Sequence, residues 1–417
     1  MLLFVAGMLL LAACGGGDER PSLLFTSGNT LYSVRDDGSR VTELARLDAP
    51  PPPVAFSPDG RRAAHACRPD ADLALPQTAL CIKAVETEEV RTVSEDRLDP
   101  PGFLSRDGFG GGDIAWDPGS RWVAFLVYRS AAENVVSSGD LYVYDVSADN
   151  LQQLDNGEFA AYRGRLRWSP DSGHLAVAKT PAIESGTTLQ VIDLASGEHT
   201  DLTSGQAGVV DQYNWAPDGD RLAMTVNTSV GGLSGNVTLL VVDLQGGHRE
   251  LPLGPWYPIS AAWSPDGRWL AVSAAPAGSS GGFARVFIVA ASGGESRDVA
   301  PDLASGDYPA WAPDSRRLAF IGAPELGPPD RFPAAALYIV DAGLMEPPRA
   351  VSQLHEKVIF PVMSWAPDGA HIFYTADGPP CREGCPPGVL YTASTDDDIS
   401  AVITDFVVDS FLEWRTD

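Results

Sequence analysis

Residues Trp263 to Val272 read WSPDGRWLAV, and near copies of this stretch recur along the chain. The copies are FSPDGRRAAH, WDPGSRWVAF, WSPDSGHLAV, WAPDGDRLAM, WAPDSRRLAF and WAPDGAHIFY, which begin at Phe56, Trp116, Trp168, Trp215, Trp311 and Trp365. The successive aromatic positions, with Trp414 added at the end, lie 60, 52, 47, 48, 48, 54 and 49 residues apart. A period of this size is typical of propeller blades or of helical repeats.

The residues between the copies favour strands over helices. One unit contains four short runs separated by turn residues: ISAAW (259–263), RWLAVSA (268–274), ARVFIVAA (284–291) and RDVA (297–300). These runs alternate apolar and small or polar residues, and they lack the i, i+3, i+4, i+7 spacing of an amphipathic helix. The unit therefore predicts four antiparallel strands, which make one propeller blade.

The two ends of the chain predict how the ring closes. The runs SLLFTSG (22–28), TLYSVR (30–35) and VTELARL (41–47) supply strands two to four of a blade that lacks its first strand. The run DSFLEW (409–414) supplies a first strand that lacks the rest. Joining them removes exposed sheet edges, so we predict an all-β, eight-bladed propeller of four-stranded blades. A seven-bladed ring is the alternative if the first unit is distorted.

Two further positions repeat with the aromatic residue. Aspartates recur in the turn, at Asp59, Asp171, Asp218, Asp266, Asp314 and Asp368. Their regularity predicts that they bond their own turn amides and are not a catalytic set. Six residues after each aromatic lies Arg62, Trp122, His174, Arg221, Trp269, Arg317 or His371, which we interpret as an exposed strand position of mixed type.

The motif W-[SA]-P-[DG]-[GS]-x-x-[LIV]-[AF], followed by runs such as DLYVYDV (140–146), resembles the repeat of TolB-type β-propellers, distant relatives of the WD repeats. The resemblance implies a propeller and, through TolB itself, binding of envelope proteins. The resemblance covers essentially everything after residue 22, so the sequence leaves no room for the small α/β domain that TolB carries. Prolyl oligopeptidases have similar propellers, but this sequence contains no G-x-S-x-G elbow and no segment of hydrolase length.

The amino-terminal residues indicate export. Leu2 to Ala13 form an apolar run too short for an ordinary membrane span. LAAC (11–14) resembles a bacterial lipobox, which implies lipidation of Cys14. We therefore predict a signal peptide at 1–13, a lipidated tether at 14–21 and the propeller at 22–417. The protein would be extracytoplasmic, anchored to a bacterial membrane by lipid alone. A plain signal peptide or an uncleaved anchor remains the alternative.

Four further cysteines form two pairs that are close in sequence: Cys67 with Cys81, and Cys381 with Cys385. In an exported chain an even number of cysteines suggests disulfides. The two pairs lie far apart in sequence and no histidine pair has ligand spacing, so we predict no zinc or other metal site.

Neither charge nor motifs indicate catalysis or nucleic-acid binding. The formal net charge is −26, which repels a phosphate backbone and argues against a nucleic-acid partner. None of the six histidines lies at a spacing that signals a triad. No glycine-rich phosphate loop opens a helix. We therefore expect a protein that is not an enzyme and has no cofactor.

The predicted binding site lies at the face that carries the long loops, those between strands two and three and between strands four and one. The residue three before each aromatic should ring the mouth of the central channel there. The polar members of this set are Asp113, Arg165, Gln212 and Tyr308, and nearby aromatic candidates are Tyr162, Trp256 and Tyr257.

We expect a monomer that binds an envelope protein or peptide at this face. The alternatives are a glycan-binding or carbohydrate-active propeller at the channel mouth, and a passive scaffold.

Overall fold

The computed structural model describes residues 21–27, 30–46, 54–67, 79–85, 87, 89–93, 97–98, 114–128, 139–155, 166–179, 187–203, 208–228, 236–277, 283–327, 333–343, 346–355, 363–376, 388–396, 400–408 and 410–415. These residues form thirty-two strands and no α-helix. No helix among them is long and apolar enough to cross a membrane.

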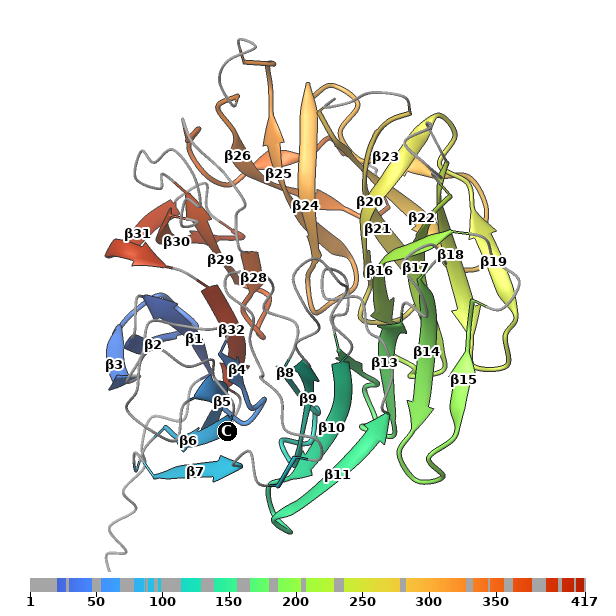
Figure 1. The fold of residues 1–417 in the computed structure, drawn as a ribbon. Helices are drawn as coiled ribbons and strands as arrows, with labels where there is room; N and C mark the ends of the chain where they lie inside the picture. The colour runs from blue at the N-terminus through green and yellow to red at the C-terminus, as the bar shows by residue number, and fades with distance from the viewer. Residues whose placement is uncertain are drawn as a thin grey trace, which may run out of the picture.

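The strands assemble into eight four-stranded antiparallel sheets, arranged as a ring (Figure 1). Blade 1 contains β1 (Ser22–Ser27), β2 (Thr30–Arg35), β3 (Thr42–Arg46) and β32 (Ser410–Arg415). Blade 2 contains β4 (Ala55–Phe56), β5 (Arg62–Cys67), β6 (Ala79–Ala84) and β7 (Val90–Val93). Blade 3 contains β8 (Ile114–Trp116), β9 (Trp122–Tyr128), β10 (Gly139–Asp145) and β11 (Asn150–Asp155). Blade 4 contains β12 (Arg167–Trp168), β13 (His174–Lys179), β14 (Thr188–Asp193) and β15 (His199–Asp201).

Blades 5 to 8 follow the same order along the chain. Blade 5 contains β16 (Val209–Trp215), β17 (Arg221–Asn227), β18 (Val237–Asp243) and β19 (His248–Leu251), and blade 6 contains β20 (Trp256–Trp263), β21 (Trp269–Pro276), β22 (Arg285–Ala290) and β23 (Arg297–Asp298). Blade 7 contains β24 (Ser305–Trp311), β25 (Arg317–Ala323), β26 (Ala336–Asp341) and β27 (Arg349–Ala350). Blade 8 contains β28 (Met363–Trp365), β29 (His371–Ala376), β30 (Gly388–Ser394) and β31 (Ser400–Val408).

The ring closes as the sequence predicts. The order of strands in blade 1 is β3-β2-β1-β32, so the last strand of the chain pairs with the first. The register places Leu23 opposite Trp414 and Phe25 opposite Phe411. The eight-bladed prediction and its closure are therefore confirmed, and the seven-bladed alternative is wrong.

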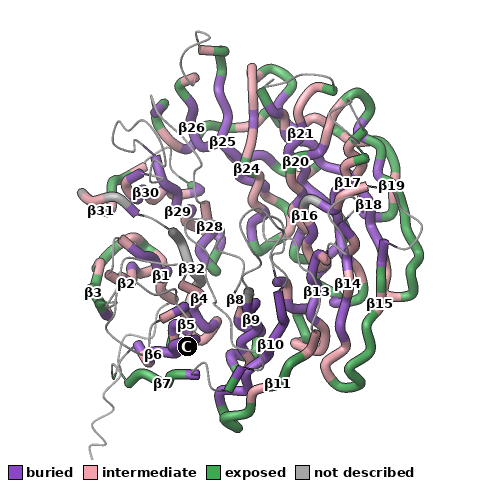
Figure 2. Tube along the Cα trace, viewed as in Figure 1, coloured by how far each residue is buried: buried purple, intermediate pink, exposed green. Residues whose placement is uncertain are grey.

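The core is divided into eight hydrophobic clusters, each shared by two neighbouring blades. The cluster around Phe25, Phe373 and Trp414 joins blade 8 to blade 1 and completes the circle. The exposed residues gather in outer strands such as β15 and β19 and at the turns (Figure 2). Burial between blades, more than within them, therefore stabilises the ring.

The repeated tryptophans join each blade to the preceding one by a hydrogen bond. Trp311 Nε1 donates to Ala262 O (3.1 Å), and Ala262 immediately precedes the tryptophan of the previous blade. The same bond recurs from Trp116, Trp168, Trp215, Trp263 and Trp365, at 2.9–3.2 Å, while Trp414 donates to Ser364 Oγ. Phe56, the aromatic of blade 2, has no such donor.

The position six residues after the aromatic is half-buried, so its interpretation as exposed was wrong. Its side chains are planar, and several stack on the tryptophan of the next blade. Trp122 lies over Trp168 with ring centroids 6.1 Å apart. Arg221 lies 5.0 Å from the centroid of the Trp263 ring. Arginine, histidine and tryptophan are interchangeable here because each presents a flat surface.

The turn aspartates bond their own amides, as the sequence predicts. Asp266 Oδ1 accepts from Arg268 N (3.1 Å) and from Ser264 Oγ (2.6 Å). Glycine or serine follows in the left-handed region, with φ 68° at Gly267 and 58° at Ser315. Ser315 Oγ accepts from Asp266 N in the preceding blade (3.0 Å), so this strained serine gains a bond between blades.

The turn between strands three and four carries a further aspartate that is ionised in a buried setting. Asp145 lies 8 % exposed at the end of β10. Burial raises its pKa, but hydrogen bonds from Arg121, from the Ala148 and Ser147 amides and from Trp122 outweigh burial and lower the pKa to about 2. These contacts fix the turn at the face opposite the long loops.

Candidate functional site

Four of the predicted binding residues lie in described strands. Gln212 lies in β16, Trp256 and Tyr257 begin β20, and Tyr308 lies in β24. These are the inner strands of three consecutive blades, 5, 6 and 7, and neighbouring inner strands contact each other. Asp113, Tyr162 and Arg165 lie outside the described residues.

All three inner strands carry a bulge, which lies four residues before the tryptophan in β16 and β20 and two to three residues before it in β24. The register shifts between Val210 and Gln212 in β16, between Pro258 and Ser260 in β20, and between Asp307 and Ala310 in β24. A bulge inserts an extra residue and redirects the side chains beside it. In β20 the extra residue is Ile259, whose side chain is left 47 % exposed.

Tyr308 occupies the bulge of β24 in a conformation that few non-glycine residues adopt. Its φ is 56°, and the residue remains 36 % exposed. Asp307 holds this geometry, since its Oδ1 accepts from Tyr308 N (2.7 Å) and from the buried Ser273 Oγ. Burial, and secondly Asp307, raise the pKa of Tyr308 to about 12. The phenol is therefore neutral and able to donate a hydrogen bond at physiological pH. Strained residues of this kind concentrate at binding sites.

Five exposed apolar side chains lie at the long-loop ends of two of the blades that carry these bulges. Ile259, Phe283, Tyr308, Leu326 and Leu354 are each at least 36 % exposed, and all belong to the long-loop ends of blades 6 and 7. Among the described residues only two other large apolar side chains are as exposed, Val90 and Val402. We call the five-residue group the apolar sector. Exposed apolar residues that share one face mark interaction sites more often than residues spread singly over the surface do.

Trp256 and Tyr257 line a pocket of about 300 Å³ between blades 5 and 6. Its walls are the start of β18, the end of β19 and the segment that leads into β20, and they include Asn236, Val237, Thr238, Glu250, Pro252 and Pro258. Trp256 is half-buried, with its ring centroid 5.3 Å from that of Phe287. Tyr257 makes no hydrogen bond through its hydroxyl to any described residue. Sequence reasoning found the two aromatic residues but not the pocket.

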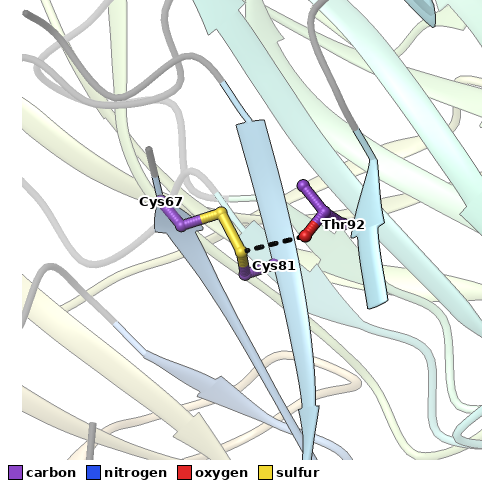
Figure 3. Close-up of a disulfide and its surroundings, with 3 residues drawn as sticks. All are labelled: Cys67, Cys81 and Thr92. Atoms are coloured by element: carbon purple, nitrogen blue, oxygen red, sulfur yellow. Dashed lines mark hydrogen bonds between the residues drawn. A yellow bond between two sulfur atoms is a disulfide. The ribbon is translucent and has the colours of Figure 1, made fainter. Parts of the chain in front are cut away.

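Cys67 and Cys81 form a disulfide that joins the end of β5 to β6 (Figure 3). Cys81 Sγ also lies 3.7 Å from Thr92 Oγ1 in β7. The prediction for this pair is confirmed, and the bond is consistent with an oxidising, extracytoplasmic compartment. Cys14, Cys381 and Cys385 lie outside the described residues.

Two of the described histidines pack against aromatic side chains. His174 lies against Trp215, with ring centroids 6.1 Å apart. His355 is 2 % exposed, and its Nε2 lies 3.0 Å from Tyr374 Oη. In the part of the chain that the structure describes, no three His, Cys, Asp or Glu side chains gather closely enough to hold a metal ion.

No protein-family model and no curated protein matches the sequence. Solved structures do match the fold. A eukaryotic initiation factor is 11% identical with a TM-score of 0.53, and the match covers 96% of this chain and 99% of that one. Prolyl endopeptidase is 15% identical with a TM-score of 0.51, and the match covers 92% of this chain and 50% of the enzyme.

TolB from Acinetobacter baumannii is also among the structures similar to this chain. It is 15% identical with a TM-score of 0.39, and the match covers 66% of this chain and 62% of TolB. The chain thus spans less than two thirds of that protein. The two likenesses with TM-scores above 0.5 show the propeller fold, and TolB proteins are among the other similar structures.

The expectation that the chain is not an enzyme, which was drawn from its motifs, was wrong as an exclusion, because similar structures include enzymes. Prolyl endopeptidase, with a TM-score of 0.51, and an oligogalacturonate lyase, with a TM-score of 0.50, are both similar to this chain. A fold similar to this one therefore occurs in enzymes, and the propeller gives no ground for excluding catalysis.

Proposed function

We propose that this chain is a binding propeller of the bacterial envelope that engages a protein or peptide through the apolar sector of its long-loop face. The observation that supports this most is Tyr308, a strained and half-exposed aromatic held by Asp307 in β24, which contacts the strand β20 that carries the exposed Ile259. A rigid scaffold that presents apolar side chains from bulged strands suits a protein surface or an extended peptide.

Site-specific photocrosslinking tests this function. A photoreactive phenylalanine is placed at Ile259 in cells that express the full chain. The control places it at Arg268, whose side chain is 77% exposed in the turn at the opposite face. We expect a discrete crosslinked protein from position 259 only, and its loss when Tyr308→Ala is added. Equal crosslinking from both positions would contradict the proposal.

We also propose that Cys14 is the lipidated amino terminus, on the strength of LAAC (11–14) and the apolar run before it. Mass spectrometry of the amino-terminal peptide from the membrane fraction tests this. A diacylglyceryl-modified Cys14 is expected, and Cys14→Ser should release the protein from the membrane. An intact Met1 in the soluble fraction would refute the anchor.

A further inference from the structure

At the long-loop face the structure describes this level of three seams between blades, and two of them have a backbone hydrogen bond that the third lacks. Between blades 6 and 7, Gly306 N donates to Ala284 O (2.8 Å). Between blades 4 and 5, Val210 N donates to Thr187 O (3.5 Å). Gly306 and Val210 both lie five residues before the tryptophan of their blade.

At the seam between blades 5 and 6 the corresponding donor is Pro258, which has no N–H. Pro258 faces Ala274 in its blade as Val210 faces Val226 and Gly306 faces Gly322, so the three positions are equivalent. The corresponding acceptor is Val237 O, because Val237 precedes the residue paired with Val226 just as Ala284 precedes the one paired with Ala274.

Val237 O receives no hydrogen bond from any described residue. The outer strand β19 does not reach it, since the pairing of β18 with β19 runs only from Leu239 to Val242. The neighbouring Asn236 bonds toward β17, where its carbonyl accepts from Thr228 N (3.0 Å). Backbone groups alternate in direction along a strand, so the N–H and C=O of Val237 point away from β17.

The pocket lies at this gap. Val237 and Pro258 both line it, together with the aromatic rings of Trp256 and Tyr257. The gap is therefore a short open strand edge with an apolar floor beside it. An unpaired backbone edge next to side-chain pockets is the geometry that accepts an added strand.

The charge of the gap indicates the chemistry of the added strand. Glu250 lies on the pocket wall, is exposed, and forms no ion pair with any described residue. The chain as a whole carries a net charge of −26, so basic segments are attracted over a longer range. A lysine or arginine beside Glu250 would complement the site.

We propose that this gap, which we call the open seam, binds an extended basic peptide segment of a partner protein. One peptide residue pairs with Val237, donating its N–H to Val237 O and accepting from Val237 N. A neighbouring apolar side chain enters the pocket against Tyr257, and a basic side chain meets Glu250. The inference rests on the proposed binding function and names the segment of partner that the long-loop face would hold.

A Pro258→Val variant tests the open seam, because it restores the donor that Val210 supplies between blades 4 and 5. Linear dodecamer peptides are selected on the full chain from a random phage library, and their affinity is measured by fluorescence anisotropy. Pro258→Val should weaken binding about tenfold by occupying Val237 O. Pro255→Ala is the matched control, since it alters a proline of the same segment without facing Val237, and it should leave the affinity unchanged.

N-methylation of the peptides supplies a second test that needs no variant of the protein. Methylation at the one residue paired with Val237 should abolish binding, whereas methylation of either neighbour should not. Equal affinity for wild type and Pro258→Val, or indifference to every N-methyl group, would overturn the open seam. So would a selection that enriches no peptide, or a glycan array whose hits depend on Pro258.

The two proposals fail in different ways. Selected peptides that lose affinity with Ile259→Asp but not with Pro258→Val would overturn the open seam and leave binding at the apolar sector standing. Loss of the crosslink from position 259, with peptide binding still sensitive to Pro258→Val, would overturn the apolar sector and keep the open seam.

Discussion

Replacement of Trp311 by phenylalanine tests how the blades hold together. The indole N–H donates to Ala262 O (3.1 Å), and the side chain is 8 % exposed in the cluster between blades 6 and 7. Trp311→Phe removes this bond and leaves the carbonyl without its donor, which costs about 1–3 kcal/mol. The smaller ring loses about 1 kcal/mol of apolar burial. We therefore expect the free energy of unfolding to fall by about 2–4 kcal/mol.

Trp269→Phe is the matched control for this variant. Trp269 is half-buried on the adjacent strand β21, and its indole donates to no described residue. The same chemical change there should cost less than about 1 kcal/mol. Urea unfolding, monitored by tryptophan fluorescence, gives the free energy of unfolding of the two variants, and they are compared on the condition that their m-values are the same. A loss at Trp311 no larger than that at Trp269 would refute the role of the indole bond.

Three further predictions concern the turns, acid and the disulfide. Ser315→Ala keeps the strained φ of 58° and loses the hydrogen bond from Asp266 N, so it should lower the free energy of unfolding by about 1–2 kcal/mol. Ser315→Gly relieves the strain as it loses the same bond, so its stability in thermal melts should be close to that of the wild type. The folded pKa of Asp145 is about 2, below its ordinary 3.8, so its stabilisation is present above pH 4 and is lost as pH falls toward 2; Asp145→Asn should flatten the acid limb of a pH titration. Reduction of Cys67–Cys81, which closes a loop of 14 residues, should lower stability by about 3 kcal/mol, and a melt unchanged by dithiothreitol would contradict this.

The sequence predicts the blade count because the tryptophan is tied to the geometry of the ring. Each Trp lies at one seam and bonds to the residue before the previous Trp, so its period in the sequence equals one blade. The sequence predicts the closure of the ring in the same way. The run ending at Trp414 is a first strand without its blade, and the run beginning at Ser22 starts a blade without its first strand, so the two pair. Where a residue has a single structural role that repeats, sequence spacing reports the architecture directly.

The position six residues after the aromatic shows why chemical class alone misleads. Arginine, histidine and tryptophan differ in charge and hydropathy, which suggests a variable surface position. They share a flat face, and the structure uses it, as when Arg317 lies 5.2 Å from the Trp365 ring centroid. Burial there depends on the neighbouring blade, which no local pattern of one strand reveals.

The candidate site was predictable in its residues but not in its arrangement. Tyr308 and Gln212 follow from their place three before a tryptophan, and Tyr257 from its aromatic character in a loop-face segment. The bulges that redirect the side chains beside them are set by pairing with the second strand, so the sequence of the inner strand does not show them.

Pro258 is the residue whose meaning depends most on comparison between blades. Within β20 alone, a proline near the start of the strand indicates nothing unusual, because prolines are tolerated where a strand begins. Aligned with Val210 and Gly306, it is the one described residue of its set that cannot donate across the seam. A missing N–H at a repeated position leaves its acceptor, Val237 O, open to another donor. In a repeat protein, therefore, a departure from the repeat at a backbone position is a stronger indication of a binding site than an unusual side chain, because the other blades described at this position, those of Val210 and Gly306, show what normally occupies it.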